Sequence, residues 1–347
     1  MNELQSLTDL PSTYLDKLYE LNLNPLWPNL RALLPEGQPQ ARSHSTHWRY
    51  EDIRPLLLQA GDLTPIEKAE RRVLVLCNPG LGLENLQATP SIYVGMQLIL
   101  PGEDAPNHRH TPSAIRLIVE GTGGFTTVEG ERLPMEHGDL ILTPPGLWHE
   151  HGHEGQGPVV WLDALDLPFI YALEASFAEV SPLQNADAIP DASQTRFTSA
   201  GLVPFDELRT NNDYPMRRYP WKQTRSSLLS LASQVGRKKP VHLAYINPLT
   251  GEECLPFLGF SALMLRPGET VRLPKRSSSQ VLHIVEGHGE AQINDNDFKW
   301  SQSDVLAMPS HSRVTLSNAS TTEPAFVFII DDAPLHRKLK IYMETDW

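Results

Sequence analysis

The chain has 347 residues, enough for two ordinary domains, and 40% of them are hydrophobic, which suffices for well-packed cores. Its formal net charge of -13 argues against a nucleic-acid partner, which requires a basic surface. Apolar runs stay well short of the ~20 residues of a membrane helix, and the acidic N-terminus lacks the basic start of a signal peptide. We therefore expect a cytoplasmic protein without a nucleic-acid or membrane partner, in which Cys77 and Cys254 are buried, reduced thiols.

The N-terminal part of the chain predicts helices and an irregular wrapping segment. A helix is expected over residues 12–21, and prolines at positions 25 and 28 interrupt the chain after it. Thr64-Pro65 has the form of a helix N-cap followed by a first-turn proline. The segment RVLVLCNP at 72–79 then predicts a strand, which ends at Pro79-Gly80.

From residue 92 to about residue 170 the pattern changes to short apolar strands separated by glycine and proline. Residues 169–180 predict a helix, a polar irregular stretch follows, and the strand pattern returns from residue 241 to about 330. The chain therefore divides into five expected segments. They are an N-terminal wrapping segment (1–90), a first barrel (91–180), a connector (181–240), a second barrel (241–335) and a C-terminal tail (336–347).

The two strand-rich parts are copies of one another. PGEDAPNHRHTPSAIRLIVEG at 101–121 aligns without gaps to PGETVRLPKRSSSQVLHIVEG at 267–287, an offset of 166 residues. GDLILTPP at 138–145 then matches SDVLAMPS at 303–310, an offset of 165. A shared skeleton at near-constant spacing indicates two copies of one fold. Because many short strands follow one another without crossover helices, we expect an all-β-dominated fold: two antiparallel, jelly-roll-type barrels with N-terminal and connecting helices.

Three histidines of the first copy have the spacing of a metal site. His108 and His110 are two residues apart on a predicted strand and therefore share one face, and His149 lies on a later strand. Three imidazoles on one side of a metal ion leave its other coordination positions open. The second copy carries non-ligands at the matching positions: Pro274, Arg276 and Val314. We therefore expect a catalytic metal in the first barrel and none in the second.

The same comparison separates candidate pocket residues from structural ones. Four polar residues of the first copy align with apolar residues of the second: Gln97, Arg116, His151 and Asp163. Their counterparts are Leu263, Leu282, Leu316, and either Phe328 or Ile329. By contrast, Asp139 matches Asp304, and Asp166 matches Asp331 or Asp332. Carboxylates that recur in both copies are expected to be structural.

The histidine-containing segments Gly102-x5-His108-x-His110 and Gly138-x5-Pro144-x4-His149 resemble the two motifs of the cupins. The resemblance covers both repeats, from about residue 90 to 330. The family usually supplies a glutamate four or five residues after the second histidine, where this chain has Ala114 and Ile115. The resemblance therefore implies a bicupin with a three-histidine site.

Within the cupins, HRHTPSAIRLIVEGTGG, TPPGLWHEHGH, RRVLVLCNPGL at 71–81 and WLDALDLP at 161–168 resemble the gentisate 1,2-dioxygenase family. Close relatives in that family cleave salicylate or 1-hydroxy-2-naphthoate. The resemblance implies mononuclear Fe(II) and an O2-dependent ring opening between the carboxyl-bearing carbon and its hydroxylated neighbour, which converts gentisate to maleylpyruvate. A small aromatic acid and O2 are then the partners, and a homotetramer is the implied assembly.

Roles follow for the candidate residues as hypotheses. Arg116 is expected to pair with the substrate carboxylate, and Arg72 to add a second positive contact. His151 shares a strand face with His149 and is expected to accept or return a proton, with Asp163 orienting His151 or a ligand imidazole. Two residues on one face of the 92–100 strand are expected to line the pocket for the ring: Tyr93 and Gln97.

Three alternatives stay open. One is the same chemistry on salicylate or 1-hydroxy-2-naphthoate, since pocket volume decides between such acids. Another is a non-catalytic bicupin that binds a small anion or a metal and leaves a bound acid unchanged in air. The third is a metal-dependent isomerase with zinc, whose activity would persist without oxygen.

Overall fold

The computed structural model describes residues 4–181, 189–199, 201–210, 212–237 and 239–346, so parts of the predicted connector lie outside the described residues. The chain divides into two compact units, Met1–Arg42 and the remainder from Ser43 onward. The first unit contains the 3-10 helix η1 (Leu7–Asp9) and the helices α1 (Ser12–Glu20) and α2 (Leu30–Leu33). Helix α1 agrees with the helix predicted at 12–21.

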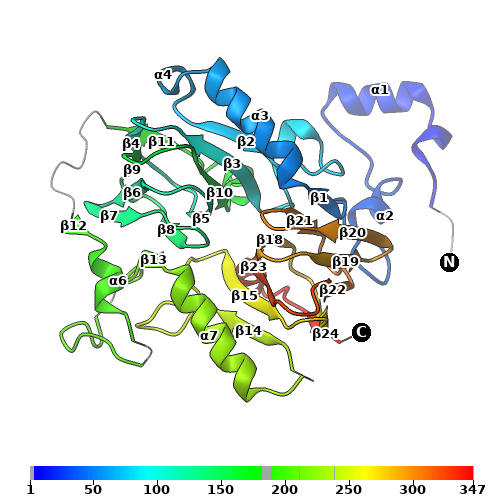
Figure 1. The fold of residues 1–347 in the computed structure, drawn as a ribbon. Helices are drawn as coiled ribbons and strands as arrows, with labels where there is room; N and C mark the ends of the chain where they lie inside the picture. The colour runs from blue at the N-terminus through cyan, green and yellow to red at the C-terminus, as the bar shows by residue number, and fades with distance from the viewer. Residues whose placement is uncertain (1–3, 182–188, 200, 211, 238, 347) are drawn as a thin grey trace. The chain divides into compact units, whose positions relative to one another are not determined.

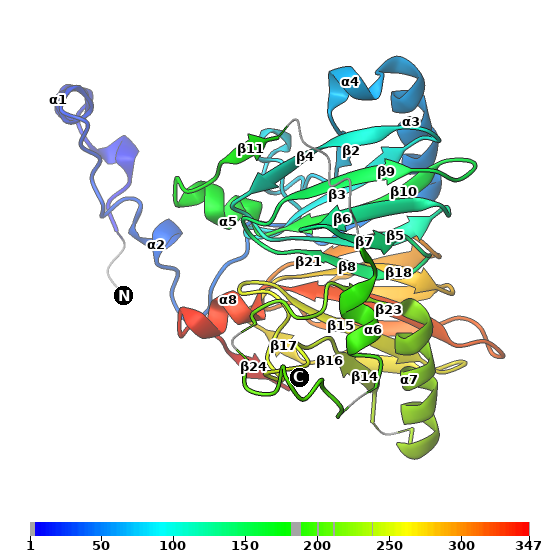
Figure 2. The same ribbon diagram turned by 90° about the vertical axis from the view of Figure 1, so that its left-hand side faces the viewer.

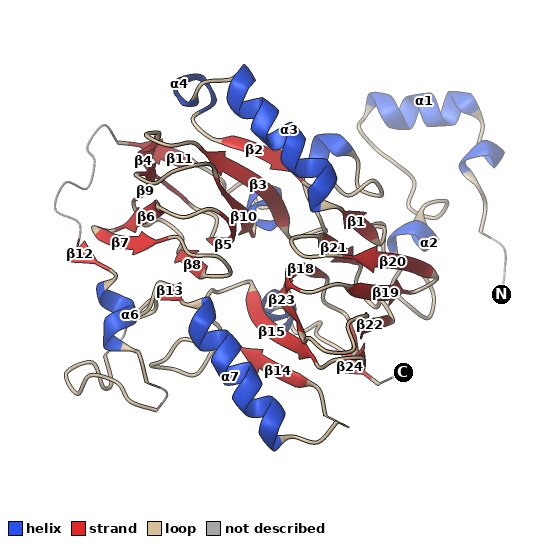
Figure 3. Cartoon of the chain, in the orientation of Figure 1, coloured by secondary structure: helices blue, strands red, loops and turns tan. Residues whose placement is uncertain are grey.

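The second unit is dominated by strands, and its helices lie outside the sheets (Figures 1 and 3). Its helices are α3 (Tyr50–Leu63), α4 (Ile66–Ala69), η2 (Leu83–Asn85), α5 (Leu167–Ala172), α6 (Ala192–Arg196), α7 (Trp221–Gln234) and α8 (Ala333–Lys338). No helix in the described part of the chain combines the length and the apolarity that crossing a bilayer requires.

Two facing sheets form the first half of the second unit. One has the order β13 (Arg218–Tyr219), β8 (Leu140–Thr143), β5 (Ala114–Glu120), β10 (Val159–Leu165), β3 (Tyr93–Ile99) and β2 (Arg72–Val75). The other has the order β11 (Ala178–Val180), β4 (Asp104–His110), β9 (His149–His153), β6 (Gly124–Val128), β7 (Glu131–Pro134) and β12 (Ile189–Pro190). The pairing is antiparallel except for β12 on β7.

The second half repeats this arrangement, and Figure 2 shows the sheets of the two halves stacked on one another. One sheet has the order β1 (Thr46–Trp48), β21 (Val305–Met308), β18 (Gln280–Glu286), β23 (Ala325–Asp331), β15 (Gly259–Leu265) and β14 (Val241–Ala244). The facing sheet is β16 (Thr270–Leu273), β22 (Val314–Asn318), β19 (Gly289–Ile293) and β20 (Asn296–Trp300). A separate ribbon joins β17 (Lys275–Arg276) to β24 (Glu344–Thr345). Within the described residues each half consists of two facing sheets that do not close, so the jelly-roll-type barrels expected from the sequence have the form of sandwiches.

The predicted internal repeat is confirmed strand by strand. Strands β3, β5 and β10 have the same lengths as β15, β18 and β23, and each pair is separated by 166 residues (93 to 259, 114 to 280, 159 to 325). The same spacing matches Asp163 to Ile329 and Asp166 to Asp332, which settles both open correspondences. Asp166 and Asp332 accept the backbone N–H of Ser113 and Ser279 at 2.8 and 2.7 Å, so this recurring carboxylate is structural.

Strand β5 explains how a polar site can lie inside an apolar sandwich. Its residues alternate between the two faces of the sheet. Ile115, Leu117 and Val119 join a core that is shared by the two halves of the unit. Arg116 and Ile118 are directed into the space between the sheets of the first half, where Ile118 packs in a smaller separate core. The shared core stabilises the fold, and the inner space remains for the site.

The two halves exchange segments. Strand β1 precedes the first half in sequence and pairs with β21 of the second, and β13 precedes the second half and pairs with β8 of the first. The helices that follow are capped in the same crossed way. Asp304 accepts the backbone N–H of Tyr50 at 2.8 Å, at the start of α3, and Asp139 accepts that of Trp221 at 2.8 Å, at the start of α7. The recurrence of Asp139 and Asp304 therefore serves helix capping.

His283 is a buried imidazole on the face of β18 that meets the shared core, where the first half has Leu117. Both of its ring nitrogens are without a hydrogen-bond partner among the described residues. Burial, followed by the charge of His137, lowers the pKa of His283 to about 3, and the charge of Asp304 acts in the opposite direction. The fold therefore holds this imidazole in its neutral form.

We expect His283→Leu to stabilise the protein, and more strongly at pH 5 than at pH 7. An unfolded histidine takes up a proton near pH 6.5, while the folded His283 stays neutral to about pH 3, so the wild type loses stability as the pH falls. The leucine variant lacks this loss, and its advantage should grow by about 2 kcal/mol between pH 7 and pH 5. Denaturant unfolding at both pH values measures it. An advantage that is equal at the two values would contradict the interpretation.

Candidate metal centre and substrate pocket

The three predicted histidines come together between the sheets of the first half. His108 and His110 lie on β4, and His149 lies on the neighbouring strand β9, directly across from His108. One ring nitrogen of each lies within 4.8 Å of the others, and all three side chains are buried. The ring centroids of His108 and His149 are 4.0 Å apart, and those of His110 and His149 are 4.8 Å apart.

Each of the three rings uses its Nδ1 atom for a hydrogen bond, which leaves its Nε2 atom available for a metal. Nδ1 of His108 donates to the carbonyl of Pro106 at 2.8 Å, Nδ1 of His110 to that of Pro112 at 2.7 Å, and Nδ1 of His149 to that of Leu147 at 3.0 Å. The tautomer is thereby set, and Nε2 of each ring carries a lone pair. The Nε2 atom of His149 is buried without a hydrogen-bond partner among the described residues.

Burial keeps the three imidazoles uncharged. It lowers the pKa of His108 to about 2 and that of His110 to about 4, and it holds the pKa of His149 well below the usual value. Three neutral, converging nitrogen donors fit a divalent transition metal, and within the described residues no carboxylate belongs to the group. The three-histidine set expected from the sequence is therefore present as a geometric cluster.

His151 lies on β9 two residues beyond His149 and is fully buried. Its Nδ1 is 3.0 Å from the hydroxyl of Thr126 on β6, and its ring lies 5.9 Å from that of His149. Its Nε2 is buried without a partner among the described residues. Burial, followed by the charge of Arg116, lowers the pKa of His151 well below its usual value. A neutral imidazole beside the metal position can accept a proton.

Arg116 and Asp163 form a buried ion pair on the same inner face. They are cross-strand partners on β5 and β10, with Nε of Arg116 3.5 Å from Oδ1 of Asp163. The guanidinium also donates to the hydroxyl of Thr143 on β8. Burial is the largest effect on both groups: it lowers the pKa of Arg116 to about 10 and raises that of Asp163 to about 6.

The contacts of Asp163 are with Trp161 and Arg116, and its expected role in orienting a histidine stays a prediction. Its carboxylate accepts the indole N–H of Trp161 at 3.0 Å and faces Arg116. The partner of His151 is Thr126, and the ligand imidazoles are held by backbone carbonyls. Thr126 was missed because a threonine on a strand gives no sequence signal beyond β propensity.

Gln97 and Tyr93 lie on β3, the strand next to β10, and Gln97 is directly across from Trp161. Gln97 is buried. A Cβ atom added at Gly95 would collide with the hydroxyl of Tyr93. The same Cβ atom would meet the side chain of Val73. Gly95 therefore leaves space beside the tyrosine that any larger residue would fill.

Arg72 is placed differently from the expectation. Strand β2 pairs with β3 so that Val73 lies across from the inward-facing Gln97, which directs Arg72 to the opposite face. There its guanidinium pairs with Glu103 and donates to the carbonyl of Gly61 at 3.3 Å. This placement does not favour the substrate-binding role expected for Arg72, which stays a prediction.

The charge of the preceding arginine, Arg71, influences the groups of the site. Its charge lowers the pKa values of His108 and Asp163, and in turn the charges of Asp163 and Tyr93 act on Arg71. The Arg71-Arg72 pair was visible in the sequence. Choosing between its members required the register of β2, because adjacent residues of a strand point to opposite faces.

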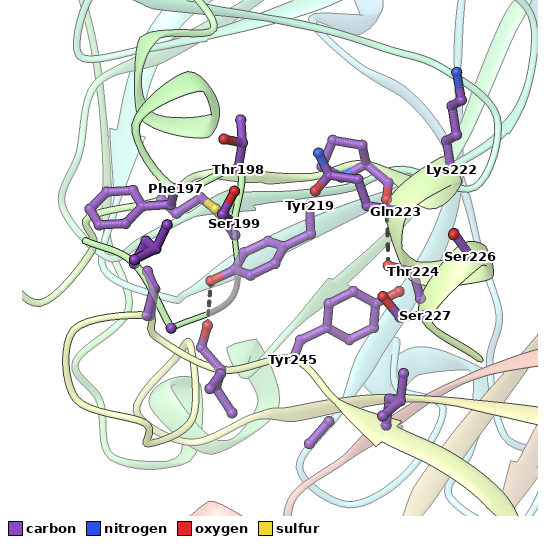
Figure 4. A pocket seen from close by; sticks show the side chains of 18 of the residues that line it. Phe197, Thr198, Ser199, Tyr219, Lys222, Gln223, Thr224, Ser226, Ser227 and Tyr245 are labelled. Carbon is purple, nitrogen blue, oxygen red and sulfur yellow. Dashed lines mark hydrogen bonds between the residues drawn. The ribbon is translucent and has the colours of Figure 1, made fainter. Parts of the chain in front are cut away.

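A separate cavity of about 800 Å³ lies away from the histidines (Figure 4). Its wall is formed by residues 197–199 and 201–203, the first half of α7 and the region of β14. Tyr219 and Tyr245 meet there edge to face at 5.6 Å, and the Tyr219 hydroxyl donates to the carbonyl of Ile246 at 2.9 Å. None of the predicted site residues lines this cavity.

Comparisons with known proteins agree with this geometry. A family model described as "Cupin domain" matches residues 95–165. The chain is 53% identical to a gentisate 1,2-dioxygenase of Ralstonia sp, over 98% of this chain and 96% of that one. It is 35% identical to a 5-aminosalicylate 1,2-dioxygenase of Comamonas sp, over 96% and 90% of the two chains.

A solved structure has the same fold. The salicylate 1,2-dioxygenase of Pseudoaminobacter salicylatoxidans, crystallised as adducts with gentisate, superposes with a TM-score of 0.90 at 28% identity, over 97% of this chain and 94% of that one. Two fused cupin sandwiches with a three-histidine cluster in the first define a bicupin of the ring-cleaving dioxygenase class. Within that class, the chain belongs to the gentisate 1,2-dioxygenase family.

Proposed function

We propose that the protein is an Fe(II)-dependent dioxygenase that opens the ring of gentisate with both atoms of O2 and releases maleylpyruvate. The observation that carries the proposal is the convergence of His108, His110 and His149 beside a buried arginine, in a chain 53% identical to a gentisate 1,2-dioxygenase over nearly its whole length. The second half, with non-ligands at the matching positions, serves the fold.

Iron is proposed because the reaction consumes O2. The three histidines would hold the ion, and bound Fe(II) supplies open coordination positions for a hydroxy acid together with the redox change that zinc lacks. Neutral imidazoles leave the ion its full double charge, which attracts an anionic substrate. The absence of a carboxylate from this cluster within the described residues favours the same assignment.

The remaining residues of the site bind and prepare the substrate. Arg116 is proposed to receive the substrate carboxylate, and Arg71, rather than Arg72, to add a second positive charge. His151 is proposed to accept the proton of the ring hydroxyl at its unpartnered Nε2 atom and to return it later. Two residues are proposed to line the space for the ring: Tyr93 and Gln97.

Salicylate-type acids form the second candidate class of substrates. The 35% identity to a 5-aminosalicylate 1,2-dioxygenase and the fold shared with a salicylate 1,2-dioxygenase favour it. The chain is also 33% identical, over 86% of its length, to a 1-hydroxy-2-naphthoate dioxygenase of Nocardioides sp. (strain KP7). All of these acids share a carboxylate with a neighbouring polar substituent, so Arg116 and the metal would bind the common part of each.

Reconstitution tests the proposal directly. Protein loaded anaerobically with Fe(II) and mixed with gentisate should remain unchanged until air is admitted, and the ring absorbance should then disappear with one O2 consumed per gentisate. We expect kcat/KM to be higher for gentisate than for salicylate, 5-aminosalicylate and 1-hydroxy-2-naphthoate. Turnover without oxygen would indicate an isomerase, and an acid that stays intact in air would indicate a binding protein; either result would overturn the proposal.

We also propose a homotetramer, from the family resemblance, and a cytoplasmic location, from the composition of the chain. The N-terminal unit supports assembly because its large apolar side chains are exposed: Leu21, Leu23, Leu26, Leu33 and Leu34. The free thiols of Cys77 and Cys254 suit a reducing compartment. Light scattering that gives the mass of a monomer, or recovery of the protein outside the cytoplasmic fraction, would contradict these proposals.

A further inference from the structure

Trp161 is a buried indole whose N–H is bonded to a residue of the site. It lies on β10, two residues before Asp163 and on the same face of that strand, and it is fully buried. Its Nε1 donates to Oδ1 of Asp163 at 3.0 Å. In the second half the residue at this position, 166 further along the chain, is Val327. The indole is therefore present in the half that has the site and absent from the half that lacks it.

The bond from Trp161 is the first link of a chain of contacts that ends at Arg116. Oδ1 of Asp163 lies 3.5 Å from Nε of Arg116, across the pairing of β10 and β5. On its other side Arg116 donates to the hydroxyl of Thr143. The guanidinium is thus hydrogen-bonded to Thr143 and lies at ion-pair distance from Asp163, and the Asp163 carboxylate is itself hydrogen-bonded to the indole.

We propose that Trp161 is a positioning residue, whose indole N–H fixes the Asp163 carboxylate and, through it, holds the Arg116 guanidinium where it receives the carboxylate of the substrate. This inference rests on the proposed function for the role of Arg116. Trp161 itself touches no reacting atom. Its ring packs 5.4 Å from that of His151, and a phenyl ring in the same place preserves that packing while removing the donor.

The charges around Asp163 give the proposal a pH signature. Burial raises the pKa of Asp163 to about 6, and Arg116, the bond from Trp161 and Arg71 each lower it. From β3, the group that faces this carboxylate is Tyr93, whose own pKa burial raises. Removing the indole N–H should raise the pKa of Asp163 further, so that near neutral pH more of it is protonated and no longer pairs with Arg116. Raising the pH restores the charge and the pairing.

The experiment compares Trp161→Phe with Trp300→Phe in the iron-loaded protein. Trp300 is also fully buried, but it lies in the second half and its Nε1 is without a hydrogen-bond partner among the described residues. For Trp161→Phe we expect the KM for gentisate at pH 7 to rise about tenfold with kcat changed much less, since the lost bond is to a charged group. The rise in KM should shrink toward pH 8.5. Trp300→Phe should leave KM unchanged across this range.

A double-mutant cycle separates positioning from a general loss of packing. In the Asp163→Asn background the indole has no carboxylate to fix, so Trp161→Phe should add no further rise in KM. An unchanged KM in Trp161→Phe, a rise that is the same at every pH, or full additivity with Asp163→Asn would overturn the proposal.

A binding measurement keeps this test distinct from the test of the proposed function. The Kd of salicylate is measured without oxygen by calorimetry, and it should rise in Trp161→Phe about as much as KM does, and stay unchanged in Trp300→Phe. If the wild type fails to turn over gentisate, the proposed function fails, and the salicylate Kd of the two variants still decides the role of Trp161.

Discussion

His149→Ala should abolish both metal binding and turnover while leaving the fold intact. The imidazole supplies one of the three nitrogen donors, and two remaining histidines without a carboxylate make a weak site. The fold should survive because the second half has Val314 at the equivalent position of an equivalent strand. Iron content after desalting and the loss of gentisate turnover, by more than about 1,000-fold, measure the effect.

His153→Ala is the matched control for this change. It lies on the same strand and is also buried, but its ring is bonded to the carbonyl of Gly157 at 2.6 Å and to the N–H of Gly155 at 3.1 Å. We expect this variant to keep its iron. Retention of iron and activity in His149→Ala, or global unfolding of that variant by circular dichroism, would contradict the assignment.

Arg116→Leu should retain iron and raise the KM for gentisate by about 10- to 100-fold, the range expected for a lost charge-assisted contact. Leucine is the residue that the second half has at this position, Leu282, so the side chain is compatible with the strand. The substitution also leaves the Asp163 carboxylate buried without its partner, and some loss of stability should accompany the kinetic effect.

Arg72→Leu distinguishes the substrate contact from the loss of any buried arginine. Its guanidinium pairs with Glu103 on the other face of the sheet, so stability should fall while KM stays unchanged. Steady-state kinetics and denaturant unfolding on both variants provide the comparison. An unchanged KM in Arg116→Leu would discard its carboxylate role, and a raised KM in Arg72→Leu would restore the role first expected of that residue.

The metal cluster and its neighbours were predictable because the sequence contains two copies of one fold, and the copy without the histidines can be compared with the copy that has them. The i, i+2 spacing of His108 and His110 needs no more than strand geometry to place both on one face. Arg116 and Asp163 have apolar counterparts in the second half, which marked them as site residues, whereas Asp166 recurs as a carboxylate and is structural. These inferences used local periodicity and alignment, which the sequence contains in full.

What could not be predicted depends on pairing between distant segments. Arg71 and Arg72 are adjacent, and the register of β2 on β3 decides which of them faces the site. Helix α3 was not predicted, and it forms although Pro55, its sixth residue, lacks the N–H that would bond to the carbonyl of Glu51. Trp161 was missed because a tryptophan among apolar residues is most simply interpreted as packing, and its acceptor depends on the strand's exact twist.

The crossed pairing of β1 and β13 has a consequence for how this protein can be divided. We propose that each repeat begins at the strand before its helix, at Thr46 and Arg218, ahead of the boundaries at 91 and 241. Either half expressed alone would present a sheet edge and a carboxylate that normally caps the other half's helix, Asp139 or Asp304. Such fragments should aggregate or remain unfolded, because each would lack the strand and the capping carboxylate that the other half supplies.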